Sequence, residues 1–302
     1  MKLRSINALF GYSIAIGTLG FFTRMVNGID LLTIVFFRAL LAAIFIYGFL
    51  SVTRKTKQLI PHNIGLLFIN ALCHSGMMVT FIWAILNTTI SNTVVLNHAA
   101  PIFAIIFSRI FLKETIRNST VISIAISVIG MFLLVDITEL SLHSETAFGD
   151  MMALASGIFF AGSMVTGKVL TRTNSSAAIT FWQMALTTTA LIPFIQIPTV
   201  DVLLPAALPL LGLGFIGTGL SYFLFMIGVE HLDAQVVLIV PTIGLIFPIV
   251  GAWLIYGEVL STTNIAGSIL ILLGVLISQL HFNVFRSPMG HELRPAVLSK
   301  EI

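Results

Sequence analysis

The sequence holds few charges and a single cysteine. Of its 302 residues, 9% are charged and 57% are hydrophobic, whereas an ordinary soluble domain has roughly 25% charged and 45–50% apolar residues. The lone Cys73 excludes a disulfide framework and a thiolate metal set. One soluble core of this length cannot hide so much apolar surface, so we expect the chain to face lipid.

Several functional motifs are also absent. The sequence contains no HExxH, no P-loop and no paired carboxylates within its apolar segments. An intramembrane hydrolase or an ATP-driven pump would need one of these, so we expect no enzyme activity, no catalytic residues, no cofactor and no metal. The net charge is only +3 and the basic residues lie between apolar runs, which argues against a nucleic-acid partner.

Long apolar segments dominate what is present. Since about 20 residues of helix cross a bilayer, the sequence predicts ten transmembrane helices. Their expected ranges are 6–23, 31–50, 63–86, 91–112, 119–135, 147–167, 178–197, 206–229, 234–255 and 263–282. The fold class predicted is an all-α polytopic membrane protein.

The basic residues indicate an orientation, because Lys and Arg near helix ends are retained in the cytoplasm. With the N-terminus inside, thirteen of the fifteen basic residues fall at or near the cytoplasm, Arg24 falls outside and Arg38 lies within the membrane. We therefore expect an uncleaved first helix, both termini in the cytoplasm, and a multi-pass location in the plasma (inner) membrane.

The two halves of the chain repeat at an offset of 143 to 145 residues. The matching pairs are Phe37-Arg38-Ala39-Leu40 with Trp182-Gln183-Met184-Ala185, Gly17 with Gly162, and Ser75-Gly76 with Thr218-Gly219. Because five helices is an odd number, the second half enters from the opposite side, and the repeats are inverted, as in many transporters. The expected domains are a first repeat (1–135), an external linker (136–146), a second repeat (147–285) and a cytoplasmic tail (286–302).

Two local patterns accompany this duplication. The second predicted helix begins with Phe36-Phe37-Arg38-Ala39, and the fourth contains Pro101-Ile102-Phe103-Ala104 and ends at Lys113-Glu114. With these features the chain resembles the drug/metabolite transporter superfamily, specifically its ten-helix EamA-type exporters. The resemblance implies a central cavity, alternating access, and substrates such as amino acids or similar small metabolites.

Two histidines, His74 and His98, interrupt apolar helices. Asn70 lies on the same helix face as His74, and this face continues toward Phe81. Since histidine has an unperturbed pKa of about 6.5, both are candidates for substrate contact and proton coupling. The alternative is that each imidazole only satisfies a neighbouring helix.

Arg38 lies about two turns inside its helix, where a charge is costly. Either it fixes helix packing or reaches the membrane surface, or it contacts substrate. Pro101, Pro241 and Pro248 free helix carbonyls that must line a cavity or face protein, while Gly219 permits close helix packing or a hinge.

We therefore predict a secondary carrier that exports a small polar metabolite. Uptake, translocation of a lipid-linked substrate and intramembrane enzymology are the alternatives, and the chain is either a monomer or a homodimer. The predicted substrate contacts are His74, His98, Asn70, Asn97, Phe81, Trp182, Gln183 and Tyr222, with Arg38, Pro101, Pro241, Pro248 and Gly219 in structural or gating roles.

Overall fold

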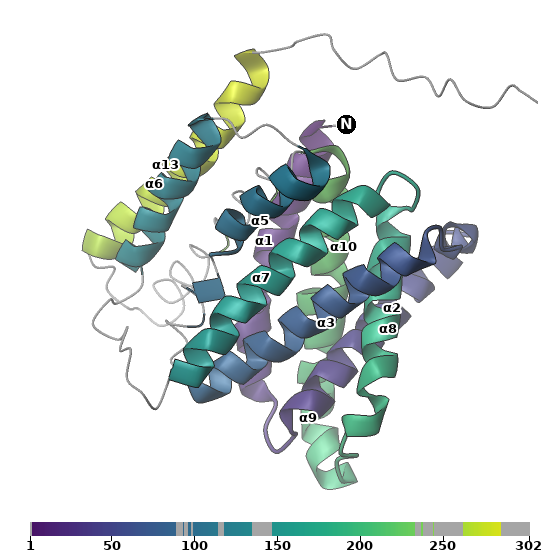
Figure 1. The fold of residues 1–302 in the computed structure, drawn as a ribbon. Helices are drawn as coiled ribbons and strands as arrows, with labels where there is room; N and C mark the ends of the chain where they lie inside the picture. Colours follow the sequence, from purple (N-terminus) through teal and green to yellow (C-terminus); the bar gives the residue numbers. More distant parts are fainter. Residues whose placement is uncertain are drawn as a thin grey trace, which may run out of the picture.

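A computed structural model describes residues 2–88, 93, 96, 97, 99–113, 118–134, 147–232, 237, 244 and 262–284. Every element in these ranges is helical (Figure 1). The first half holds α1 (Lys2–Met25), α2 (Leu31–Val52), η1 (Thr56–Leu59), α3 (Ile64–Asn87), α5 (Ala100–Phe107), η2 (Ser108–Leu112) and α6 (Asn118–Leu134). The second half holds α7 (Ala147–Leu170), α8 (Ser176–Leu191), η4 (Ile192–Phe194), α9 (Val200–Gly214), η5 (Phe215–Leu220), α10 (Ser221–His231) and α13 (Thr262–Val284).

Polar residues begin several of these helices. Asp30, Asn63 and Ser175 precede α2, α3 and α8, and their side chains accept hydrogen bonds from the backbone N–H three residues later, at 3.1, 3.3 and 3.1 Å. These bonds satisfy donors that have no partner within the first turn of a helix. The caps therefore fix where three long apolar helices start.

Five described helices are long and apolar enough to cross a membrane. They are Leu31–Val52, Ile64–Ala84, Ala147–Leu170, Ser176–Phe194 and the continuous helix Val200–His231. Nine of the ten predicted segments contain a described helix, and the ninth, 234–255, lies outside the described residues except for Val237 and Gly244. The prediction of an all-helical fold with membrane-length apolar helices is confirmed.

Two predicted boundaries were wrong. The seventh segment was expected to run to residue 197, but α8 ends at Leu191 and a short 3₁₀ turn ends at Phe194. Pro193 explains the early end, because proline has no N–H to donate to the carbonyl of Thr189 and so cannot continue the α-helical hydrogen bonding. The eighth helix begins at Val200 instead of 206 and holds Pro205 within it.

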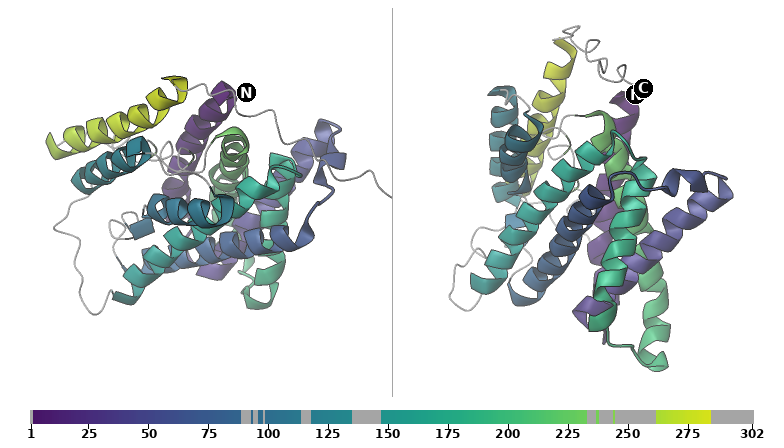
Figure 2. Two further views of the ribbon diagram at one scale, coloured as in Figure 1. Left: turned by 45° about the horizontal axis from the view of Figure 1, so that its top comes forward. Right: turned by 45° about the vertical axis from the view of Figure 1, so that its right-hand side comes forward.

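The long helices pack as pairs. α1 packs along η5 and α10, α2 along α8, α3 along α7, and α6 along α13 (Figures 1 and 2). The views in Figures 1 and 2 all show α6 and α13 side by side at the periphery of the molecule. Each pair joins one helix of the first half to one of the second.

Contacts along each pair show that its two helices run in opposite directions. In α3 and α7, Thr88 bonds Asp150 while Asn70 bonds Thr166. In α1 and the continuous helix Val200–His231, Ser5 bonds the Ile227 carbonyl and Phe22 lies against Gly212. In α2 and α8, Thr33 bonds Gln196, just beyond α8, and Leu50 packs with Ala177. In α6 and α13, Gly130 lies against Gly267 and Ser127 lies against Gly274. All four pairs are therefore antiparallel.

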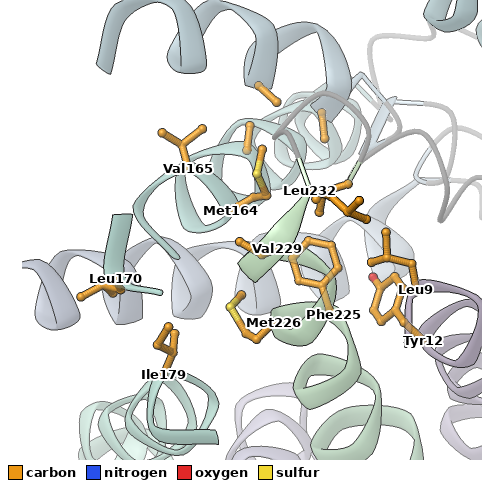
Figure 3. Packing of buried hydrophobic residues seen from close by; sticks show 14 of the residues in the cluster. Leu9, Tyr12, Met164, Val165, Leu170, Ile179, Phe225, Met226, Val229 and Leu232 are labelled. Carbon is orange, nitrogen blue, oxygen red and sulfur yellow. The ribbon is translucent and has the colours of Figure 1, made fainter. Parts of the chain in front are cut away.

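A buried apolar cluster lies where α1, α7, α8 and α10 meet (Figure 3). Phe225 of α10 is near its centre, with the ring of Tyr12 5.1 Å away and that of Phe160 5.3 Å away, measured between centroids. The cluster holds helices of both halves together beside the polar side chains described next.

Candidate functional site

Arg38 is the eighth residue of α2 and is only 2% exposed. Its Nε donates to Thr218 Oγ1 at 3.2 Å. The same hydroxyl donates to the Leu213 carbonyl, five residues back, at 2.7 Å. The π-helical turn η5 carries this arrangement, and such turns occur frequently at functional sites. Burial inside the protein contradicts the idea that Arg38 reaches outward to the membrane surface.

Two glycines, one at the end of α9 and one in η5, let α2 approach this helix closely. A Cβ atom at Gly214 would lie 2.4 Å from Leu41 Cβ, and one at Gly219 would lie 3.2 Å from Ala42 Cα. Larger residues at either position would separate the two helices. The glycines therefore bring the Arg38 side chain against Thr218.

Tyr222 follows Thr218 by one helical turn and meets His74 of α3. The two rings are 4.5 Å apart between centroids, with their planes at 87°. The Tyr222 hydroxyl donates to Met77 Sδ at 3.8 Å, and the ring of Tyr12 lies 6.2 Å from that of Tyr222. Side chains of α1, α3 and α10 thus converge at this phenol.

Ser163 of α7 joins α3 to α8. Asn70 Nδ2 donates to its carbonyl at 2.7 Å and to Thr166 Oγ1 at 2.8 Å. Gln183 Nε2 donates to the Ser163 hydroxyl at 3.1 Å. Three helices therefore share one polar contact point.

We call these residues the central polar cluster: Arg38, Asn70, His74, Ser163, Gln183, Thr218 and Tyr222. All seven are buried. His74 Nε2, Asn70 Oδ1 and Gln183 Oε1 have no hydrogen-bond partner among the described residues. Because a buried unpaired polar atom costs about 1–3 kcal/mol, such atoms need an explanation, and a bound polar molecule supplies one.

The structure brings four predicted substrate contacts, Asn70, His74, Gln183 and Tyr222, into this cluster. Phe81 packs beside them, against a buried group that includes Tyr222. His98, Pro241 and Pro248 lie outside the described residues.

Two other predicted contacts use their polar atoms elsewhere. Trp182 Nε1 donates to the Leu59 carbonyl in η1 at 2.9 Å. Asn97 Nδ2 donates to Ser156 Oγ in α7 at 2.7 Å. Neither side chain bonds a member of the central polar cluster in the described structure.

Pro101 lies in the first turn of α5, which begins at Ala100. A proline there leaves no helical hydrogen bond unmade. The carbonyl of Asn97 faces α7, where a Cβ on Gly157 would come within 2.8 Å of it. The carbonyl expected to be freed by Pro101 therefore packs against a glycine of the other half.

Thr218 and Ser163 were missing from the predicted contacts. Each lies next to a glycine of the internal repeat, Thr218 before Gly219 and Ser163 after Gly162. Small polar residues beside such glycines lie where helix backbones approach closely and can hydrogen-bond across helices. A small polar residue beside a repeat glycine was therefore the sequence feature that could have identified both side chains.

Membrane-length apolar helices that enclose buried, unpaired polar atoms are typical of a membrane transport protein. Within the described residues, no group of three or more His, Cys, Asp or Glu side chains could hold a metal ion. Residues 3–136 and 147–280 each match the EamA-like transporter family. The chain belongs to this family, within the drug/metabolite transporter superfamily, and is a transporter and not an enzyme.

Several relatives carry transporter names. An uncharacterized transporter of Archaeoglobus fulgidus is 28% identical over 274 residues, which cover 88% of this chain and 93% of that protein. The pseudopaline exporter CntI of Pseudomonas aeruginosa is 27% identical over 247 residues, or 80% and 84% of the two chains. A crystal structure with 14% identity and a TM-score of 0.78 covers 93% of this chain and 98% of its own, and this likeness concerns the fold alone.

Proposed function

We propose that this protein is a secondary exporter of a small polar metabolite and works by alternating access around the central polar cluster. The observation that carries the proposal is the set of buried atoms on His74, Asn70 and Gln183 that have no hydrogen-bond partner in the described part of the chain and lie where helices of both halves meet. A substrate that offers both donors and acceptors would satisfy them. Its binding would replace the hydrogen bonds that it loses on leaving water.

The proposed architecture is a pair of inverted five-helix repeats. α2 and α8 begin 145 residues apart, at Leu31 and Ser176, and they lie antiparallel. α6 and α13 begin 144 residues apart, at Asn118 and Thr262, and are antiparallel as well. A rotation that superposes one helix of such an antiparallel pair on the other must reverse the helix direction, and this supports an inverted second repeat.

Contacts between other helices also correspond across the two halves. The offset relates α1 to α7 and α3 to α10, and the packing of α1 on α10 corresponds to that of α3 on α7. A Cβ on Gly157 would meet the backbone of Ala100, and one on Gly244 would meet the backbone of Ser13. Positions 13 and 157, and 100 and 244, are each 144 residues apart. If the two equivalent interfaces, α1 with α10 and α3 with α7, exchanged their packing arrangements, the central polar cluster would be exposed to each side of the membrane in turn.

Export is favoured over uptake because a relative is named a pseudopaline exporter. The same comparison supports a polar metabolite over a lipid-linked one. We place the protein in the plasma (inner) membrane with both termini in the cytoplasm, on the distribution of its basic residues. His74 and His98 are the residues through which proton coupling is proposed.

A panel of labelled amino acids, hydroxy acids and lipid-linked sugars, tested on proteoliposomes with and without a pH gradient, tests this function. We expect at least one small polar compound to cross faster than in protein-free vesicles, and a lipid-linked sugar not to do so. The Gly48→Ala protein is a matched control, because nothing lies within 4 Å of the added Cβ. Failure of every small compound, or movement of the lipid-linked sugar alone, would contradict the proposal.

A further inference from the structure

The guanidinium of Arg38 has N–H donors that no described residue accepts. Among the described residues its one hydrogen bond is from Nε to Thr218 Oγ1. A guanidinium carries five N–H donors, so those on Nη1 and Nη2 are left to bind something else. These two nitrogens form the end of the planar fork that matches a carboxylate bidentately.

No carboxylate among the described residues pairs with Arg38. The four described acids all lie at helix ends: Asp30 caps α2, Asp150 and Asp201 lie in the first turns of α7 and α9, and Glu230 lies at the end of α10. A buried cation without a counter-charge is costly. An anionic group delivered by the substrate would lower that cost.

A comparison of the two halves separates this role from packing. Arg38 is the eighth residue of α2, and Gln183 is the eighth residue of α8, its partner in the repeat. Gln183 ties α8 to Ser163 through a neutral amide. The two contacts differ, because Gln183 bonds α7 and Arg38 bonds η5. A neutral side chain at this position of the repeat nevertheless forms a hydrogen bond between helices, so such a bond does not need the charge of Arg38.

The surroundings of Arg38 fit a substrate site. Its partner Thr218 lies one turn before Tyr222, which packs edge-on against His74. His74 Nε2 is buried and unpartnered among the described residues. Apolar side chains of α2, α3 and α8, including Val35, Met77 and Met184, pack around Tyr222. An ionic hydrogen bond is stronger in such a low-dielectric setting than in water.

We propose that Arg38 binds a carboxylate of the transported substrate end-on through Nη1 and Nη2, and that Thr218 orients the guanidinium. This inference rests on the proposed function and narrows it to carboxylate-bearing metabolites. Arg38 contacts substrate, whereas Thr218 is a positioning residue.

The test compares acids with their isosteric amides. Three pairs serve as probes: L-phenylalanine with L-phenylalaninamide, L-lactate with lactamide, and succinate with succinamide. Transport into proteoliposomes and the shift in melting temperature of the purified protein are measured for wild type, Arg38→Gln and Arg38→Lys. Arg38→Gln places the amide of the second half at the equivalent position of the first.

We expect wild type to prefer at least one acid over its amide by about tenfold or more, as for loss of a charge-assisted hydrogen bond. Arg38→Gln should abolish this preference by lowering the acid rate about tenfold more than the amide rate, and Arg38→Lys should keep part of it. Should Arg38→Gln fail to fold, Thr218→Val tests the same claim, since it removes the hydroxyl that orients the fork and should weaken the preference. A fall in both rates by the same factor, or an unchanged preference, overturns the inference.

The two readouts separate this inference from the proposed function. If wild type transports an acid but Arg38→Gln keeps the acid preference, the function stands and the carboxylate site is wrong. If nothing is transported, yet an acid stabilises wild type and not Arg38→Gln, the carboxylate site stands and the transport function fails. If no acid is transported and none stabilises the protein, both are overturned.

Discussion

The imidazole of His74 stands edge-on to the phenol of Tyr222, with the ring centroids 4.5 Å apart and the planes at 87°. The contact joins α3 of the first half to α10 of the second. One nitrogen of that imidazole, Nε2, is left without a partner among the described residues. The pair therefore links the two halves and holds a polar atom that no described residue bonds.

His74→Ala should lower transport by about tenfold, since it removes one hydrogen-bonding group from the proposed substrate site. Tyr222→Phe should have a smaller effect, because it keeps the ring contact and loses only the hydrogen bond to Met77 Sδ. His98→Ala should also lower transport. Rates in proteoliposomes are compared at equal, monodisperse protein content, and full transport by the His74 and His98 double variant would refute both assignments.

Gly214→Ala should destabilise the protein by about 1–3 kcal/mol, the usual effect of overpacking. Its Cβ would lie 2.4 Å from Leu41 Cβ, an atom that moves only with the backbone of α2. Gly48→Ala should be neutral or stabilising, because its Cβ meets nothing within 4 Å and alanine favours helix. Melting of the two purified variants gives the comparison, and equal melting temperatures would show that α2 and α9 are not in close contact.

Gly162→Cys should form a disulfide with Cys73. A Cβ at residue 162 would lie 3.8 Å from Cys73 Cβ, which is about the mean separation in disulfides. Oxidation should arrest transport and reduction should restore it, because the bond would clamp α3 to α7. Peptide mass spectrometry detects the link. Gly65→Cys, which has no neighbour within 4 Å, should remain reduced, and an oxidised Gly162→Cys protein that still transports would show that this interface need not move.

Reporter fusions test the orientation. Green fluorescent protein fused after Ile302 should fluoresce, and alkaline phosphatase inserted within 136–146 should be active, because the distribution of basic residues predicts a C-terminus inside and this linker outside. A phosphatase that is active only after Ile302 would reverse the topology.

Much of the fold was predictable because lipid imposes one simple rule. Helices with all backbone groups paired must appear as long apolar runs, and nine of those runs contain described helices. The end of α8 was missed because the run stays apolar through Ile195 and again at Ile197, whereas local proline chemistry stops the helix at Leu191. Hydrophobicity therefore located the helices better than it located their ends.

The site was only partly predictable. His74, Asn70 and Gln183 are visible in the sequence as polar residues in apolar runs. Thr218 and Ser163 are common in such helices, and only the three-dimensional contacts distinguish them. The Trp182 indole bonds to Leu59, a residue 123 positions away in sequence, which no helical spacing reveals.

The most direct test of substrate transport through the central polar cluster is a counterflow measurement. Proteoliposomes loaded with an unlabelled substrate from the panel are diluted into the same compound in labelled form. Wild type should show a transient accumulation of label above equilibrium, the signature of a carrier that exposes one site to each side in turn, and the triple variant Arg38→Gln, His74→Ala, Gln183→Ala should show none at equal protein content. Simple equilibration by wild type, or an undiminished overshoot by the triple variant, would contradict this account.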